Sequence, residues 1–174
     1  MSEQLEEETR ALLEEYLQHC VSPHDETALS PAAQTLLRAV NELMEPSRSL
    51  IESRCDRITA NPAIVLRTVA AQMLLDGGLN CGRAVALICF AGFLTQQRGK
   101  RRAGTPEELT EVLTHFLAVE HRDWLQSSGG WDGFFKNFSK KRTQRAQENS
   151  TISNALMAAA GFGLAGLAFI LSVR

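Results

Sequence analysis

One run of this chain is apolar on every side. Residues 84–94 read Ala-Val-Ala-Leu-Ile-Cys-Phe-Ala-Gly-Phe-Leu. As a helix, this run has no polar face to turn toward water, so other helices must surround it. The helix is expected to begin near Asn80 and reach Leu94, which is too short to predict a membrane span. The chain therefore has to build a helical bundle around this segment.

Amphipathic segments on both sides can supply the surrounding helices. Residues 3–20 place apolar side chains on one helical stripe, with glutamates opposite. Ser30-Pro31, Asn61-Pro62 and Thr105-Pro106 each pair a capping side chain with proline at the first helical position, and each predicts a helix start. The second of these helices is expected to turn five side chains inward: Ile64, Val65, Val69, Met73 and Leu74. The inward stripe of the third is expected to include Leu109 and Val119. We expect an all-α domain of about eight helices over residues 1–148.

The C-terminal stretch differs from everything before it. Residues 155–173 contain no charge, and basic residues precede them at 136–145. A run of about 17–25 apolar residues is what a hydrocarbon core needs, and positive flanks mark the cytosolic side. The alternative is a buried core helix, which the length and the lack of amphipathic alternation disfavour. The N-terminus has no signal-peptide pattern. We expect a tail anchor over residues 152–173, on the cytosolic face of the mitochondrial outer membrane, the endoplasmic reticulum, or both.

The charge distribution agrees with this expectation. Residues 1–97 carry a formal charge of −6, whereas residues 98–174 carry +4. The basic end leads into the apolar tail, so an acidic membrane surface explains the asymmetry better than nucleic acid does. The sequons at Asn137 and Asn149 precede the anchor, would face the cytosol, and are expected to stay unmodified.

The sequence contains no pattern that predicts catalysis. The four histidines are scattered, and none of the phosphate-binding, nucleophile-elbow or zinc-protease motifs is present. The four cysteines lack metal-ligand spacing and read as free thiols in a reducing compartment: Cys20, Cys55, Cys81 and Cys89. We expect no enzymatic activity, no catalytic residue, no cofactor and no metal.

Two short segments are more specific. The first is Asn80-Cys-Gly82-Arg83, at the start of the apolar helix. A glycine inside a helix costs about 1 kcal/mol relative to alanine, so a close backbone approach must compensate. A cation in the first turn opposes the helix dipole and needs an anionic partner. That partner is either a ligand's carboxylate or an Asp or Glu of this chain, and the residues alone leave both open.

The second segment is Trp124 to Phe138, which contains Gly129-Gly130-Trp131-Asp132. Asp132 near a helix start suits the dipole. Trp131, Phe134 and Phe138 form one aromatic face, which in most proteins is core packing.

Together these segments resemble the Bcl-2 family. Asn80-x-Gly82-Arg83 is similar to the family's first homology motif, and the run from Trp124 to Phe138 to the second. The stripe around Leu12 and Tyr16 resembles the fourth motif. Residues 36–40 and the short loop before them are most similar to the Bcl-2-like 10 subgroup.

The sequence departs from the family pattern in both the first and the third motif. Cys81 stands where the first motif usually has tryptophan. In the third motif, whose helix we call the death helix, Asn41-Glu42 replaces the usual Gly-Asp. The second departure argues against a pore-forming effector, whose own death helix must be donated to a partner.

The resemblance implies a bundle around a central apolar hairpin, with a surface groove for a partner's death helix. In that groove Arg83 would pair with a ligand aspartate, Asn80 would hydrogen-bond the same carboxylate, and Gly82 would allow close approach. Four apolar side chains would line it: Leu74, Ala86, Phe90 and Phe138. Gly130, Trp131 and Asp132 would be structural.

The implied function is regulation of apoptosis, in the pro-survival direction. The expected partners are death helices of pro-apoptotic relatives and, through the anchor, a membrane. Two alternatives remain: a pro-apoptotic pore-forming effector, and a regulator of a calcium channel of the endoplasmic reticulum, which the subgroup resemblance suggests.

Overall fold

The structure of the 174-residue chain is a computed structural model. It describes residues 2–23, 25–45, 48–49, 52, 61–75, 77–96 and 105–145, and gives the backbone alone for residues 44 and 139–145. All secondary structure in these ranges is helical, so the all-α prediction is confirmed. They hold seven α-helices where about eight were expected: α1 Ser2–Val21, α2 Pro31–Met44, α4 Pro62–Met73, α5 Cys81–Gln96, α6 Pro106–Thr114, α7 Arg122–Ser127 and α8 Gly130–Arg145.

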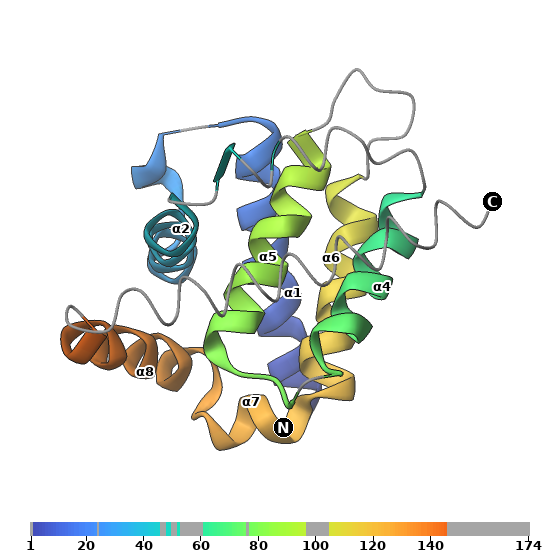
Figure 1. Ribbon diagram of the computed structural model, residues 1–174. Helices are drawn as coiled ribbons and strands as arrows, with labels where there is room; N and C mark the ends of the chain where they lie inside the picture. The colour runs from blue at the N-terminus through green and yellow to red at the C-terminus, as the bar shows by residue number, and fades with distance from the viewer. Residues whose placement is uncertain are drawn as a thin grey trace.

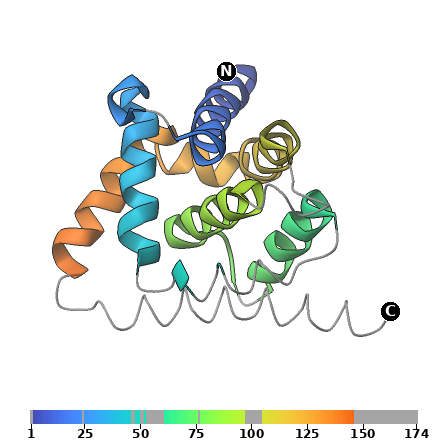
Figure 2. The same cartoon turned by 90° about the horizontal axis from the view of Figure 1, so that it is seen from above.

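The apolar helix predicted from residues 84–94 is α5, and it occupies the centre of the bundle (Figure 1). Every residue from Ala84 to Thr95 is buried. Helices α1, α2, α4 and α6 pack around it, and Figure 2 shows α5 between α2 on one side and α4 and α6 on the other. The requirement that other helices surround this run is therefore met.

The predicted caps explain where the surrounding helices begin. The Ser30 hydroxyl accepts from the backbone N–H of Ala33 at 3.2 Å and starts α2. The Asn61 side chain accepts from two backbone N–H groups at the start of α4. Thr105 accepts from the Glu108 N–H at 3.2 Å and starts α6. Each cap satisfies donors that a helix start leaves without an intrahelical partner.

Two side chains face the opposite way from the prediction. Ile64 was expected inside but is 61% exposed. Helix α4 packs against α5 and α6 through its Val65–Val69 face, and the helical repeat places Ile64 on the outer face with Leu75, which is 74% exposed. Val119, also expected inside, is 37% exposed. It lies within a π-helical segment, His115–Glu120, whose wider turn shifts the side-chain register.

The predicted anchor over 152–173 lies outside the described residues. Within the described ranges, no helix is both long enough and apolar enough for a membrane crossing.

Candidate functional site

The turn between α4 and α5 positions the first motif. The Asn80 side-chain oxygen accepts from the backbone N–H of Arg83 at 2.9 Å, and the Asn80 carbonyl accepts from Ala84 at 3.0 Å. Asn80 is therefore the N-cap of α5, as the sequence predicted. Its side-chain oxygen accepts the hydrogen bond of this cap, and its amide N–H groups can donate to a ligand. A Cβ on Gly82 would lie 3.4 Å from the Asn80 side-chain oxygen, at the short end of ordinary van der Waals contact.

Arg83 is half-buried, and backbone carbonyls hold it in place. Its Nη1 donates to the carbonyl oxygens of Gly77 and Gly78, both at 3.0 Å. No Asp or Glu of the described ranges forms an ion pair with it, and Asp76 is outside those ranges. In this part of the chain the guanidinium thus has neutral partners, and its Nε and Nη2 groups can still donate.

The apolar residues expected in the groove come from three elements. Arg83, Ala86 and Phe90 follow one another along a single stripe of α5. Ala86 and Phe90 are 6% and 7% exposed, and Leu74 at the end of α4 is half-buried. Phe138 is 8% exposed on α8, whose main packing partners are α2 and α7. Arg83 therefore stands at the exposed end of an apolar stripe, and Phe138 belongs to a separate wall.

The second motif builds the turn from α7 into α8. Gly129 and Gly130 both have positive φ, 87° and 64°, which glycine adopts without a Cβ penalty. Trp131 is buried, and its indole N–H donates to the Thr9 hydroxyl of α1 at 2.9 Å. Asp132 is exposed in the first turn of α8, where its charge suits the helix dipole. In the described part of the chain, Gly129 and Gly130 shape this turn and Trp131 links α8 to α1.

Sequence analysis did not identify several residues that stabilise the α7–α8 turn and the contact between α1 and α2. A Cβ on Gly133 would overlap the Ser128 carbonyl oxygen, so the α7–α8 turn requires glycine there. The Glu15 carboxylate accepts from the backbone N–H and the hydroxyl of Ser30, at 2.6 and 2.7 Å, and so ties α1 to the start of α2. The partners lie far apart in sequence or depend on a turn's geometry, so no local pattern marks them.

A second missed glycine is Gly92, in the middle of α5. A Cβ there would lie 3.0 Å from the Cys20 sulfur and 3.1 Å from the Tyr16 hydroxyl, both on α1. Helices α1 and α5 therefore approach closely at this point. A glycine inside an otherwise apolar helix is a signal for such an approach, and it could have been used.

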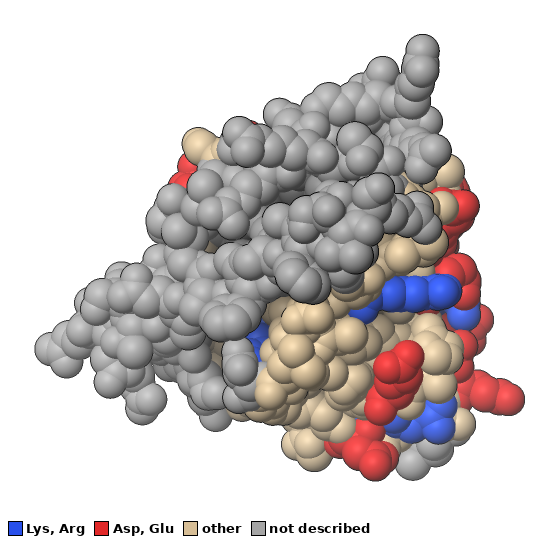
Figure 3. Space-filling view, turned by 45° about the vertical axis from the view of Figure 1, so that its right-hand side comes forward, with Lys and Arg blue, Asp and Glu red and all other residues tan. Residues whose placement is uncertain are grey.

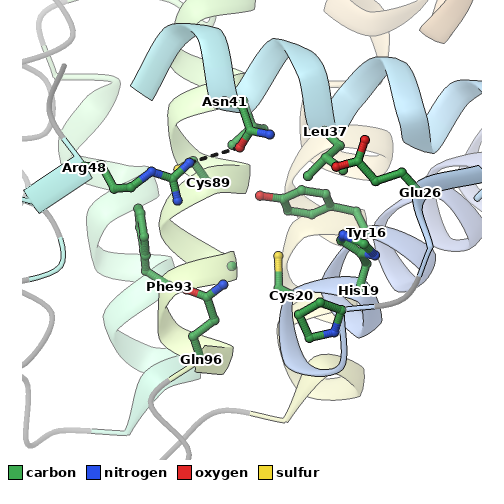
Figure 4. Close-up of a pocket in the computed structure, with 13 residues that line it drawn as sticks. Tyr16, His19, Cys20, Glu26, Leu37, Asn41, Arg48, Cys89, Phe93 and Gln96 are labelled. Atoms are coloured by element: carbon green, nitrogen blue, oxygen red, sulfur yellow. Dashed lines mark hydrogen bonds between the residues drawn. The ribbon is translucent and has the colours of Figure 1, made fainter. Parts of the chain in front are cut away.

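A pocket of about 210 Å³ lies between α1, α2 and α5, and Figure 4 shows the residues that line it. The Arg48 guanidinium donates to the Asn41 side chain at 3.0 Å and stacks over the Phe93 ring. Burial raises the pKa of the Cys20 thiol to about 11, and burial also raises the pKa of Tyr16 well above its usual value. Both groups are therefore neutral at physiological pH.

Possible metal ligands and surface charge are the remaining features of the part of the chain that the structure describes. No group of three or more His, Cys, Asp or Glu side chains is arranged to hold a metal ion there. Acidic side chains lie along the right-hand margin of the face in Figure 3, with basic ones between them. The candidate site is the corner around Asn80 and Arg83, next to the apolar stripe of α5.

Comparison with known proteins identifies a family and relatives that this chain resembles. Residues 36–131 match the family of apoptosis regulator proteins, the Bcl-2 family. The anti-apoptotic protein NR13 of Coturnix japonica is 46% identical over 98% of both chains. Human Bcl-2-like protein 10 is 30% identical over 77% of this chain and 76% of its own length.

Solved structures agree. The crystal structure of the zebrafish pro-survival protein NRZ in complex with Bad BH3 is similar with a TM-score of 0.69 and 31% identity, over 79% of this chain and 97% of that one. The resemblance to the Bcl-2-like 10 subgroup is thereby confirmed, and the family is one of regulators rather than enzymes. The chain belongs to the Bcl-2 family of apoptosis regulators.

Proposed function

We propose that this protein is a pro-survival regulator that captures the death helix of a pro-apoptotic relative. The observation that carries the proposal is the state of Arg83. Two backbone carbonyls hold its guanidinium at the end of the apolar stripe of α5, and within the described ranges no carboxylate neutralises it. A helix that brings an aspartate to this corner would supply a carboxylate partner for the guanidinium.

The geometry suits an amphipathic helix. One Arg83 nitrogen is committed to Gly77 and Gly78, so the side chain is pre-organised and loses little conformational entropy on binding. Its other N–H groups can form charge-assisted hydrogen bonds to a carboxylate. Apolar anchors of the helix would then lie along Ala86 and Phe90 in the helix-in-groove mode.

Two relatives support the direction of the effect. NRZ is called a pro-survival protein and was solved with the Bad BH3 segment, and NR13 is called anti-apoptotic. The second of these covers nearly the whole of this chain. Asn41 also argues against an effector, because it stands in the third motif where the family has Gly-Asp and its side chain accepts from Arg48.

Calorimetric titration tests the proposal. The full chain, in zwitterionic nanodiscs, is titrated with a Bad BH3 peptide and with the same peptide carrying alanine in place of its conserved aspartate. We expect saturable one-to-one binding that weakens at least tenfold for the second peptide. Absence of saturable binding, or equal affinity for both peptides, would contradict the groove. Peptide-triggered leakage of liposomes by this chain alone would instead identify an effector.

The membrane part of the proposal rests on the sequence. Residues 152–173 would anchor the domain of residues 1–148 on the cytosolic face of the mitochondrial outer membrane or the endoplasmic reticulum. Deletion of 152–174 should release a folded protein into the soluble fraction after carbonate washing, with the full chain as control. A truncated chain that stays in the membrane pellet would refute the anchor. A calcium-channel role remains an expectation of the subgroup resemblance.

A further inference from the structure

A second concave surface lies away from the death-helix corner. It is a hollow of about 480 Å³ between α1, the start of α2 and the α7–α8 turn. None of the residues that we assign to partner-helix binding lines it. The residues that do are Glu8, Ala11, Leu12, Glu15, Ser30, Ala32, Gly129, Gly130, Trp131 and Asp132.

The floor of the hollow is apolar and fixed. Leu12 and Trp131 are almost fully buried, and Ala11 and Ala32 flank them. The hydrogen bond from the Trp131 indole to Thr9 prevents the ring from turning out. At Gly130 an added Cβ would meet no atom within 4 Å, so the hollow is open on that side. A partner side chain can therefore rest on a preformed surface and need not open one.

The charged side chains in the described lining of the hollow are all acidic. Glu8, Glu15 and Asp132 line the hollow, and its described lining contains no Lys, Arg or His. Glu15 is committed to Ser30 through both oxygens. Among the described residues Glu8 accepts only from Gln4, one helical turn away, and Asp132 is exposed. Since carboxylates around a concave apolar floor attract cations and repel anions, this surface is unsuited to anionic lipid headgroups.

We infer that this hollow docks a basic amphipathic segment of a partner protein, in which an apolar side chain reaches Leu12 and Trp131 while flanking Lys or Arg side chains meet Glu8 and Asp132. This contact is independent of the death-helix groove. Since the hollow touches α1, α2 and α8 together, its occupant contacts three elements of the bundle at once.

The test uses a defined probe. A fluorescein-labelled pentapeptide with a central leucine between two pairs of lysines is titrated by anisotropy into the full chain in zwitterionic nanodiscs, at low salt. Empty nanodiscs give the background. We expect saturable binding that charge reversal by Glu8→Lys weakens about three- to tenfold. The matched control is Glu14→Lys, an exposed glutamate of the same helix outside the hollow, which should change the affinity less than twofold.

Two further arms separate the possible outcomes. A probe with serine in place of leucine should bind more weakly if the apolar floor is used. The variant Arg83→Ala and an excess of Bad BH3 peptide should leave probe binding unchanged. Equal loss in both lysine variants would mean diffuse charge attraction, and competition by Bad BH3 would place the probe in the groove. Either result, or no saturable binding above background, overturns the inference and leaves the death-helix proposal standing.

Discussion

The two segments that carry the family resemblance do different work in the bundle. In the second motif, polar and glycine positions serve internal packing: Trp131 donates to Thr9 of α1, and Gly133 lies against the Ser128 carbonyl. In the first motif, Asn80 caps α5, but Arg83 has only loop carbonyls as partners within the described ranges. A motif that is satisfied internally stabilises the fold, whereas a motif with donors left over can bind a partner.

Removal of the arginine should separate binding from stability most strongly. Arg83→Ala should weaken binding of Bad BH3 by about 2–5 kcal/mol, which is tens- to thousands-fold, because the partner's aspartate loses its cation. The free energy of unfolding should fall by less than about 1 kcal/mol, since the hydrogen bonds from Arg83 to the Gly77 and Gly78 carbonyls are exposed to solvent.

Arg67→Ala is the matched control, because Arg67 is an exposed arginine on the neighbouring helix α4. It should leave both the affinity and the stability unchanged. Calorimetry and thermal melts of the three proteins measure both quantities. An Arg83→Ala variant that melts much lower and still binds tightly would assign Arg83 to the fold and abolish the contrast between the motifs.

In the second motif the expected effect is on folding. Gly133→Ala places a methyl group into the Ser128 carbonyl and should cost about 3 kcal/mol or more of unfolding free energy. Gly130→Ala has open space, and its left-handed φ of 64° should cost only about 1–2 kcal/mol. Urea unfolding of both variants measures the difference. Similar losses would show that the turn can relax around Gly133.

These contrasts also explain what the sequence could predict. Helix starts at Ser30, Asn61 and Thr105 depend on neighbouring residues, so the sequence predicted them correctly. The burial of α5 followed from a run without any polar face. Arg83 drew attention in the sequence because a cation at the start of a buried helix needs a partner, and its role in binding stays a prediction.

The errors concern features that depend on how the helices pack, which no local pattern specifies. Helix α4 is apolar on most of its surface, so periodicity could not decide which face is inside, and Ile64 was assigned wrongly. The hydrogen bond between Thr9 and Trp131 joins residues 122 positions apart, and the sequence around neither residue predicts it. Contacts of this kind depend on how helices pack, which the alternation of residue types does not encode.

Close packing of α1 against α5 predicts a pH dependence. Burial raises the pKa of Cys20 to about 11, so the folded state keeps a proton that the unfolded chain releases above about pH 9. Stability should therefore fall as pH rises from about 9 to 11, by at most about 2 kcal/mol from this thiol, and Tyr16 acts in the same direction. Urea melts at pH 8 and 10.5 measure the loss. Cys20→Ala should reduce it, and an unchanged slope would rule out the thiol as its source.

The smallest expected effects compare two buried threonines. Thr9 accepts from Trp131 and donates to the Leu5 carbonyl at 2.7 Å, whereas the Thr110 hydroxyl is buried without a hydrogen-bond partner among the described residues. Thr9→Val leaves the indole N–H unsatisfied and should cost about 1–2 kcal/mol, while Thr110→Val removes an unpaired polar group and should be neutral or slightly stabilising. Thermal melts of the two variants, which lose the same hydroxyl and keep the same shape, isolate the hydrogen bond. If both lose the same stability, the link between α1 and the second motif contributes nothing beyond packing, and the internal role of that motif rests on its glycine turn and aromatic packing alone.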